Sequence, residues 1–169
     1  MKKTMKTKIV LALLMSGAVC MSGIYGAQAQ DITINGNEEY KEVNLIGDGN
    51  VVTISGVTQN SDRVIAGDGS NNLVKVTDSY FRQVYGAKNE DNPAVSNTVT
   101  IDGDSKIITV IGAYSETGTV SENTVNLLDS CNVDGIAYGG SSADGNAEKK
   151  SGECVRWNYR GCNWRRGKR

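Results

Sequence analysis

A short motif, Asn-x-Val-x-Ile or a close variant, recurs through the middle of this 169-residue chain and constrains its fold more than any other feature. Copies begin at Asn50, Asn72, Asn97 and Asn123, and Ile32-Thr-Ile34 is a fifth copy without the leading Asn. The equivalent apolar position advances by 20, 22, 25 and 26 residues along the series Ile32, Val52, Val74, Val99, Val125. Self-similarity at such a period is typical of solenoids and propellers, whose units bury their apolar faces only against neighbouring copies.

A second recurring segment follows each copy. These segments are Val43–Gly47, Arg63–Gly67, Gln83–Ala87, Thr109–Ala113 and Ile136–Gly140. Both kinds of segment alternate apolar and polar residues, which predicts strands, and turns rich in Gly, Asp and Asn separate them. The side chains expected to point inward from the first segments are Val52, Ile54, Val74, Val76, Val99, Ile101, Val125 and Leu127.

The fold class that this pattern predicts is all-β, a parallel β-helix or β-solenoid of about five coils over residues 30–148. Equivalent strands would stack at the usual spacing of about 4.8 Å. An antiparallel sandwich also uses short strands and Gly turns. It gives no reason, however, for each strand to resemble the strand two positions later in residue identity.

Residues 1–29 have the three parts of a secretory signal peptide. Lys2, Lys3, Lys6 and Lys8 form the cationic end, Ile9–Val19 is a short apolar run, and Ala27-Gln28-Ala29 is a small-x-small cleavage site. A lipid-modified Cys20 is the alternative, but Val19 is large for that processing. We therefore expect export to the periplasm, cell surface or medium, with no stable membrane span in the mature chain.

The repeat resembles the passenger region of autotransporter (type V secreted) proteins in three segments: the Asn-x-Val-x-Ile motif, residues 105–115 (SKIITVIGAYS) and residues 117–123 (TGTVSEN). The resemblance covers residues 32–148 and implies a right-handed β-helix that a C-terminal membrane barrel carries to the surface of a Gram-negative cell. No alternating ten-residue strands with aromatic girdles occur in this sequence. We therefore expect an N-terminal passenger fragment whose parent protein is anchored in the outer membrane.

Residues 149–169 (KKSGECVRWNYRGCNWRRGKR) differ from everything upstream. They carry 8 of the 18 basic side chains and both Trp, whereas residues 30–148 carry 18 acidic and 6 basic side chains. A nucleic-acid patch and a Cys154/Cys162 disulfide or metal site are two interpretations. A third is that the tail, shifted by one nucleotide, encodes a sixth coil compatible with NVSGGTIxGAIGG. We favour this third interpretation, which makes the tail a frameshifted, disordered segment and predicts no nucleic-acid binding.

Residue types that are catalytic or ligand-binding in other proteins have structural explanations in this sequence. The chain has no His, which excludes Ser-His-Asp and Cys-His catalysis and His-ligated zinc or haem. Cys131 is expected to fill space on or near a strand. The recurring Asn residues are expected to form a ladder of stacked amides, with contacts to a ligand as the alternative.

Two acidic patterns suggest further sites. Residues 67–73 (GDGSNNL) resemble a calcium-binding nonapeptide, but the strict nine-residue recurrence is missing. Polysaccharide-cleaving β-helix enzymes pair clustered carboxylates with a base. The candidates here are Asp78, Asp102, Asp104, Asp129 and Asp134 among the acids, and Lys41, Arg63, Lys75, Arg82, Lys88 and Lys106 among the bases. None of the bases recurs beside a carboxylate at a fixed offset, so we expect no catalytic, cofactor or metal site and no enzyme.

The function expected from these features is that of an exported bacterial surface or secreted β-solenoid with a structural or adhesive role. Its partner would be an unknown host or cell-surface ligand. The alternatives are a fragment of a β-helix enzyme acting on polysaccharides, and a frameshift product without function.

Overall fold

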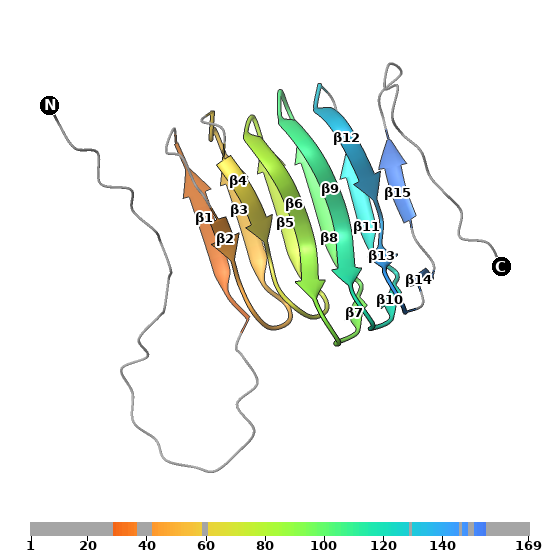
Figure 1. Ribbon diagram of the computed structural model, residues 1–169. Helices are drawn as coiled ribbons and strands as arrows, with labels where there is room; N and C mark the ends of the chain where they lie inside the picture. The colour runs from red at the N-terminus through yellow and green to blue at the C-terminus, as the bar shows by residue number, and fades with distance from the viewer. Residues whose placement is uncertain are drawn as a thin grey trace, which may run out of the picture.

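The computed structural model describes residues 29–36, 42–58, 61–128, 130–145, 147–148 and 151–154, which form strands, turns and bends and no helix. Every strand pairing within these residues is parallel, and the strands wind into the predicted β-solenoid (Figure 1). The antiparallel sandwich is therefore excluded. The predicted signal peptide up to residue 28, and with it Cys20, lies outside the described residues. Residues 155–169, which include Cys162, do so as well.

The first sheet, sheet A, stacks the motif strands in the order β1-β3-β5-β8-β11-β15. Their bounds are β1 Asp31–Asn35, β3 Val51–Ser55, β5 Leu73–Thr77, β8 Thr98–Asp102, β11 Thr124–Leu127 and β15 Ser151–Cys154. The register pairs Ile32 with Val52, Val52 with Val74, Val74 with Val99 and Val99 with Val125. This is the alignment that the repeat predicts.

The second sheet, sheet B, has the order β12-β9-β6-β4-β2, and β13 also pairs with β9. Its strands are β2 Glu42–Asn44, β4 Ser61–Ile65, β6 Tyr80–Asn89, β9 Lys106–Ser115, β12 Asn132–Tyr138 and β13 Ser141–Ser142. The second recurring segments thus also form strands. We number the coils by their strands: coil 1 holds β1 and β2, coil 2 β3 and β4, coil 3 β5 and β6, coil 4 β8 and β9, and coil 5 β11 and β12.

The alignment of the second segments is wrong by one residue in coil 1. It matched Val43 to Arg63, whereas the structure pairs Val43 with Val64. A one-residue slip would turn Val43 away from the core, because successive strand side chains face opposite sides. Gly47 still lies against Gly67, so coil 1 has one residue too many between these points. That residue is Ile46, which is displaced outward and is 61% exposed.

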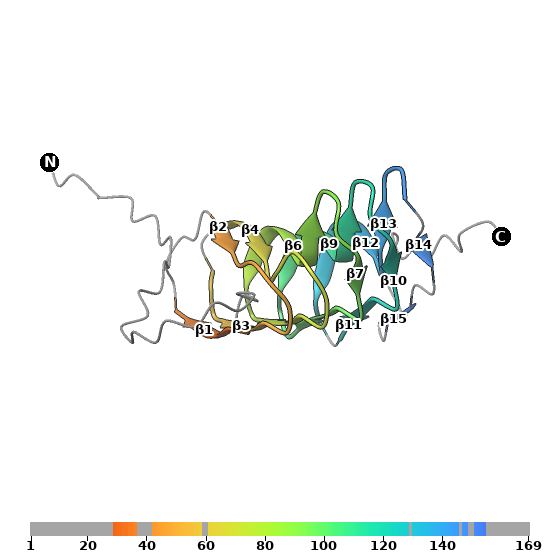
Figure 2. The same ribbon diagram turned by 90° about the horizontal axis from the view of Figure 1, so that it is seen from below.

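Among the residues that the structure describes, a third, smaller sheet lies beside coils 3, 4 and 5 only. It has the order β14-β10-β7, with β7 Ala94–Val95, β10 Val120–Ser121 and β14 Ala147–Glu148. These strands return from turns that follow β6, β9 and β13, and the turns project together from one side of the solenoid (Figure 2). We call residues 87–95, 113–121 and 140–148 the arms. Small side chains pack between the two legs of the arms: Ala87, Ala94, Ala113, Val120 and Ala147.

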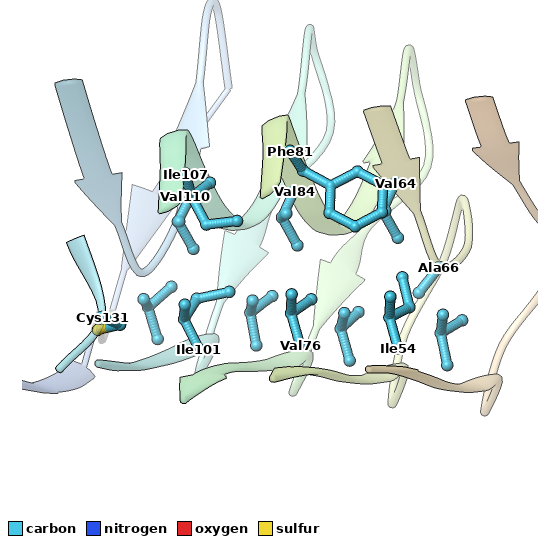
Figure 3. Close-up of a cluster of buried hydrophobic side chains, with 14 of the residues drawn as sticks. Ile54, Val64, Ala66, Val76, Phe81, Val84, Ile101, Ile107, Val110 and Cys131 are labelled. Atoms are coloured by element: carbon cyan, nitrogen blue, oxygen red, sulfur yellow. The ribbon is translucent and has the colours of Figure 1, made fainter. Parts of the chain in front are cut away.

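The main core is a continuous column of stacked aliphatic side chains between sheets A and B (Figure 3). The predicted inward residues of β3, β5, β8 and β11 are all 0–3% exposed. Opposite them lie side chains of sheet B, including Val64, Val84, Val110 and the chain's single Phe, Phe81. Like side chains lie over like because parallel in-register stacking puts each residue directly against its equivalent.

The solenoid register continues beyond residue 148, where the sequence placed the end of the repeats. Ser151–Cys154 forms β15 and pairs in parallel with Thr124–Leu127 of β11. Four residues of the predicted tail therefore follow the path of the preceding coils. The sequence did not predict this strand, because the repeat pattern ends at Glu148. Strand pairing uses backbone groups and does not require the pattern to continue.

Candidate functional site

The recurring Asn residues form a buried ladder and leave no surface for a ligand. Asn50, Asn72, Asn97 and Asn123 are 0–1% exposed. The Oδ1 atom of each accepts the backbone N–H of its equivalent one coil earlier: Gln30 to Asn50, Asn50 to Asn72, Asn72 to Asn97 and Asn97 to Asn123, at 2.8–2.9 Å. Their Nδ2 groups donate to turn carbonyls such as Ala66, Gly69 and Ala94. The prediction of a structural amide ladder is confirmed.

Three of the five acidic candidates lie together at the turns that join sheets A and B. Asp78 Oδ1 accepts the N–H of Asp104 from the next coil at 2.9 Å, and Asp102 Oδ1 accepts the N–H of Gly103 at 2.8 Å. Lys75 lies 3.9 Å from Asp102, an exposed pair that adds little. These carboxylates therefore hold turns in place.

The two remaining acidic candidates do not join this group. Asp134 lies on β12, where it accepts a hydrogen bond from Asn132 at 2.6 Å. Asp129 lies outside the described residues. Among the residues that the structure describes, no three His, Cys, Asp or Glu side chains gather where they could hold a metal ion.

Residues 67–73, which resemble a calcium-binding nonapeptide, also stabilise a turn. Asp68 Oδ1 accepts the N–H of Gly47, and Asp48 Oδ1 accepts the N–H of Ser70, each at 2.6 Å. The two Asp residues thus cross-link adjacent coils. Cys131 is 4% exposed and packs in the main core, as the sequence predicted.

The basic candidates are distributed unevenly. Arg63, Arg82, Lys88 and Lys106 all lie on strands of sheet B, whereas Lys75 lies on sheet A and Lys41 falls outside the described residues. The outer face of sheet B therefore carries most of the positive charge of an otherwise acidic solenoid.

The same outer face carries a hydrophobic column that the sequence analysis did not identify. Ile65, Tyr85, Ile111 and Tyr138 pair in succession along coils 2 to 5. Although they point away from the main core, Ile65, Tyr85 and Ile111 are only 5–8% exposed. They form a separate cluster, against which Tyr114 and Tyr138 pack.

The arms supply the wall beside this column. Lys88, Tyr114 and Ser141 are successive partners in the ladder of the arms. Tyr85 and Lys88 are three residues apart, so in a regular strand they would face opposite sides. In this structure both nevertheless border the same hollow, and Gly86, which lies between them, stacks closely on Gly112, as Gly112 does on Gly139. A Cβ atom on Gly86 would lie 2.3 Å from the carbonyl oxygen of Gly112.

Together the column and the arms border an open hollow of about 240 Å³, which we call the tyrosine groove. Its lining residues are Tyr85, Lys88, Ile111, Tyr114, Glu116, Ile136, Tyr138 and Ser141. Ile136 is 44% exposed and adds an accessible aliphatic side chain to the groove. The groove runs along the solenoid axis, because each of its sides is a column of ladder partners.

Charges flank the aromatic floor of the groove. The Lys88 ammonium lies over the ring of Tyr85, 5.6 Å from the ring centroid, a cation–π contact. Burial raises the pKa of the Tyr85 phenol, with Arg63 opposing and Tyr114 adding to that effect. The phenol is therefore uncharged near neutral pH and offers a hydroxyl group that both donates and accepts.

Hydrogen bonds cross-link the arms that form the groove wall. The Ser115 hydroxyl donates to the carbonyl of Glu90 at 3.2 Å and accepts the N–H of Gly118 at 2.9 Å. Ser142 repeats this arrangement one coil later with Gly118 and Gly145. Each arm is thus bonded to the one before it.

One signal in the sequence points to the groove. Tyr85 and Tyr138 occupy the same position of two second segments, and spacings of 25 and 26 residues in place of 20 and 22 mark the coils that carry arms. No sequence pattern, however, indicates that the arm lies beside Tyr85.

Comparisons with protein families, with curated proteins and with solved structures gave no match. No helix with the length and hydrophobicity to span a bilayer occurs among the described residues.

Proposed function

We propose that the protein is an exported bacterial β-solenoid of the autotransporter-passenger type, with an adhesive or structural role at the cell surface or outside the cell. The observation that carries the proposal is the in-register stack of parallel coils, which gives a rod with long regular outer faces. Such extended faces serve as binding surfaces in repeat proteins. The three-part sequence of residues 1–29 supports export.

The role we propose is not enzymatic. The carboxylates of Asp48, Asp68, Asp78 and Asp102 each accept a hydrogen bond from a turn backbone, most of them between coils. Carboxylates used in this way stabilise turns. Anchoring of a longer parent protein in the outer membrane is part of the same proposal.

Expression of the full chain in a Gram-negative host tests export. We expect cleavage after Ala29, seen by mass spectrometry as a mature N-terminus at Gln30, and recovery outside the cytoplasm. Beads coated with the purified mature chain should adhere to bacterial or host cells more than beads coated with its urea-unfolded form. Cytoplasmic retention of the uncleaved chain, or equal adhesion of both bead types, would contradict the proposal.

A further inference from the structure

We propose that the tyrosine groove binds an extended, linear glycan that lies along the solenoid axis across coils 3, 4 and 5. This inference rests on the proposed function, since it names the ligand class of a surface-exposed solenoid.

The shape favours a chain that passes through the groove over a small molecule enclosed by it. The hollow of about 240 Å³ is smaller than the enclosed pockets that hold small ligands. The hollow is open, and Tyr85, Ile111 and Tyr138 of three successive coils border it. An elongated ligand lying along the axis would therefore contact all three coils.

The lining combines flat aromatic rings with opposite charges. Tyr114 and Tyr138 are half-buried, so part of each ring remains accessible beside Ile136. A sugar ring presents an apolar face of C–H groups and a rim of hydroxyls, and aromatic rings pack against such faces. Lys88 can donate to the hydroxyls and Glu116 can accept from them. Since these two charges offset each other, the site does not require a charged glycan.

The spacing of the rungs distinguishes a glycan from a peptide. Each coil contributes one rung to the groove wall, and the three rungs are the ladder partners Lys88, Tyr114 and Ser141. Successive rungs are about 4.8 Å apart, as in any stack of paired strands. A sugar in an extended polysaccharide advances by a similar length, so consecutive sugars stay in step with Lys88, Tyr114 and Ser141. An extended peptide repeats its side chains on one face about every 6.7 Å and falls out of step with the rungs.

The groove needs little rearrangement to bind. Its floor is nearly inaccessible at Tyr85 and Ile111, and hydrogen bonds of Ser115 and Ser142 hold the arms together. A preformed site avoids the entropic cost of ordering side chains and loops when the ligand binds.

Isothermal titration of the purified mature chain with linear oligosaccharides tests the inference. Cellohexaose, chitohexaose, xylohexaose and hexagalacturonate sample neutral, N-acetylated, unbranched pentose and anionic chains. We expect at least one to bind, with affinity that rises with chain length up to about the three rungs of the arms and then levels off. Failure of all four to bind the folded chain would overturn the inference.

Substitutions locate the binding surface. Tyr114→Ala and Tyr138→Ala should each weaken binding about ten-fold, as truncation of a contacting aromatic side chain does. Tyr138→Phe should keep most of the affinity, because the ring remains. Tyr80→Ala is the matched control: it removes a half-buried Tyr of sheet B that does not line the groove. Binding that is unaffected by both groove substitutions, in variants with unchanged circular dichroism, would also overturn the inference.

The inference and the proposed function fail in different ways. If the chain is exported and adheres to cells but binds none of the oligosaccharides, only the glycan inference is wrong. If the purified chain binds a glycan through Tyr114 and Tyr138 but remains in the cytoplasm uncleaved, only the proposed export and surface role is wrong.

Discussion

The first two coils and the three that follow have the same core and differ in what surrounds it. The step along sheet A is 20 residues from Ile32 to Val52 and 22 from Val52 to Val74, but 25 from Val74 to Val99 and 26 from Val99 to Val125. The longer coils use the added residues for the arms and the third sheet. The inner column of aliphatic side chains passes from one region to the other without interruption.

This difference shows how a solenoid acquires a site without disturbing its core. The arms leave sheet B at stacked glycines and return to sheet A at the Asn ladder, so insertions between these points do not alter the register. The arms then face an outer column that in coil 2 carries Ile65 and in coil 1 Asn44. The groove exists only where the arm and the column occur together.

The largest expected effect is the loss of stability when a core side chain is truncated, and we compare it at two positions of one core column, one in each region. Ile34 and Ile101 belong to the same column, which also holds Ile54, Val76 and Leu127. Ile101→Ala should lower the free energy of unfolding by about 2–5 kcal/mol, since it opens a cavity at a fully buried site. Ile34 is only half-buried at the first coil, so Ile34→Ala should cost less than half as much. Urea unfolding followed by circular dichroism measures both, and equal losses would contradict this account of the core.

Next in size is the loss of one amide from the ladder that joins the regions. Asn97 Oδ1 accepts from the backbone and side chain of Asn72, and Asn97 Nδ2 donates to Gly69 and Asn123. Asn97→Ala should cost about 1–3 kcal/mol for each buried group left unpaired. Asn126→Ala removes a half-buried Asn with a single 3.4 Å contact and should stay within about 0.5 kcal/mol of wild type. Thermal and urea unfolding compare the two variants, and similar losses would show that the ladder is not structural.

A smaller effect is expected when a glycine is replaced by Ala, and it should differ between a glycine beside the arms and one in the first coil. A Cβ atom on Gly112 would lie 2.2 Å from the carbonyl oxygen of Gly139, so Gly112→Ala should destabilise the protein by about 1–3 kcal/mol and displace the arm. Gly36→Ala meets no atom within 4 Å and strains only its own backbone, at φ +113°. NMR should show shifted Tyr85, Tyr114 and Tyr138 signals in the first variant and unchanged signals in the second. Unchanged Tyr signals in both would mean that the glycine stack does not set the groove.

The smallest effect concerns the ionisation of Tyr85. Its pKa is raised above the ordinary value of 10.0 by burial. Below that pH the phenol is protonated in both the folded and unfolded states. As the pH rises above it, the unfolded phenol ionises first, so the folded state loses stability relative to the unfolded state. Tyr85→Phe removes this loss, and its free energy of unfolding relative to wild type should therefore increase between about pH 8 and pH 11. Tyr80→Phe is the control, and the same increase there would exclude Tyr85 as the cause.

The sequence predicted the solenoid because its core depends on a local, repeated pattern. Each motif copy alternates Val or Ile with polar residues, and copies stack only if equivalent residues meet, as Val52, Val74 and Val99 do. The Asn ladder was predictable for the same reason. The slip in coil 1 was not, since Val43 and Gly47 each match a partner in coil 2 and only packing shows that Ile46 is the extra residue.

The sequence by itself thus determined the fold class, the inner column and the buried amide ladder, because these follow from periodic residues that contact their own equivalents. Only the tertiary structure decided the site. The groove joins Tyr85 of β6, Glu116 of a turn and Tyr138 of β12, which different coils contribute. They meet because the coils stack and the arms lie beside the outer column, where the closely stacked glycines and the small side chains of Ala87, Ala94 and Val120 allow close packing.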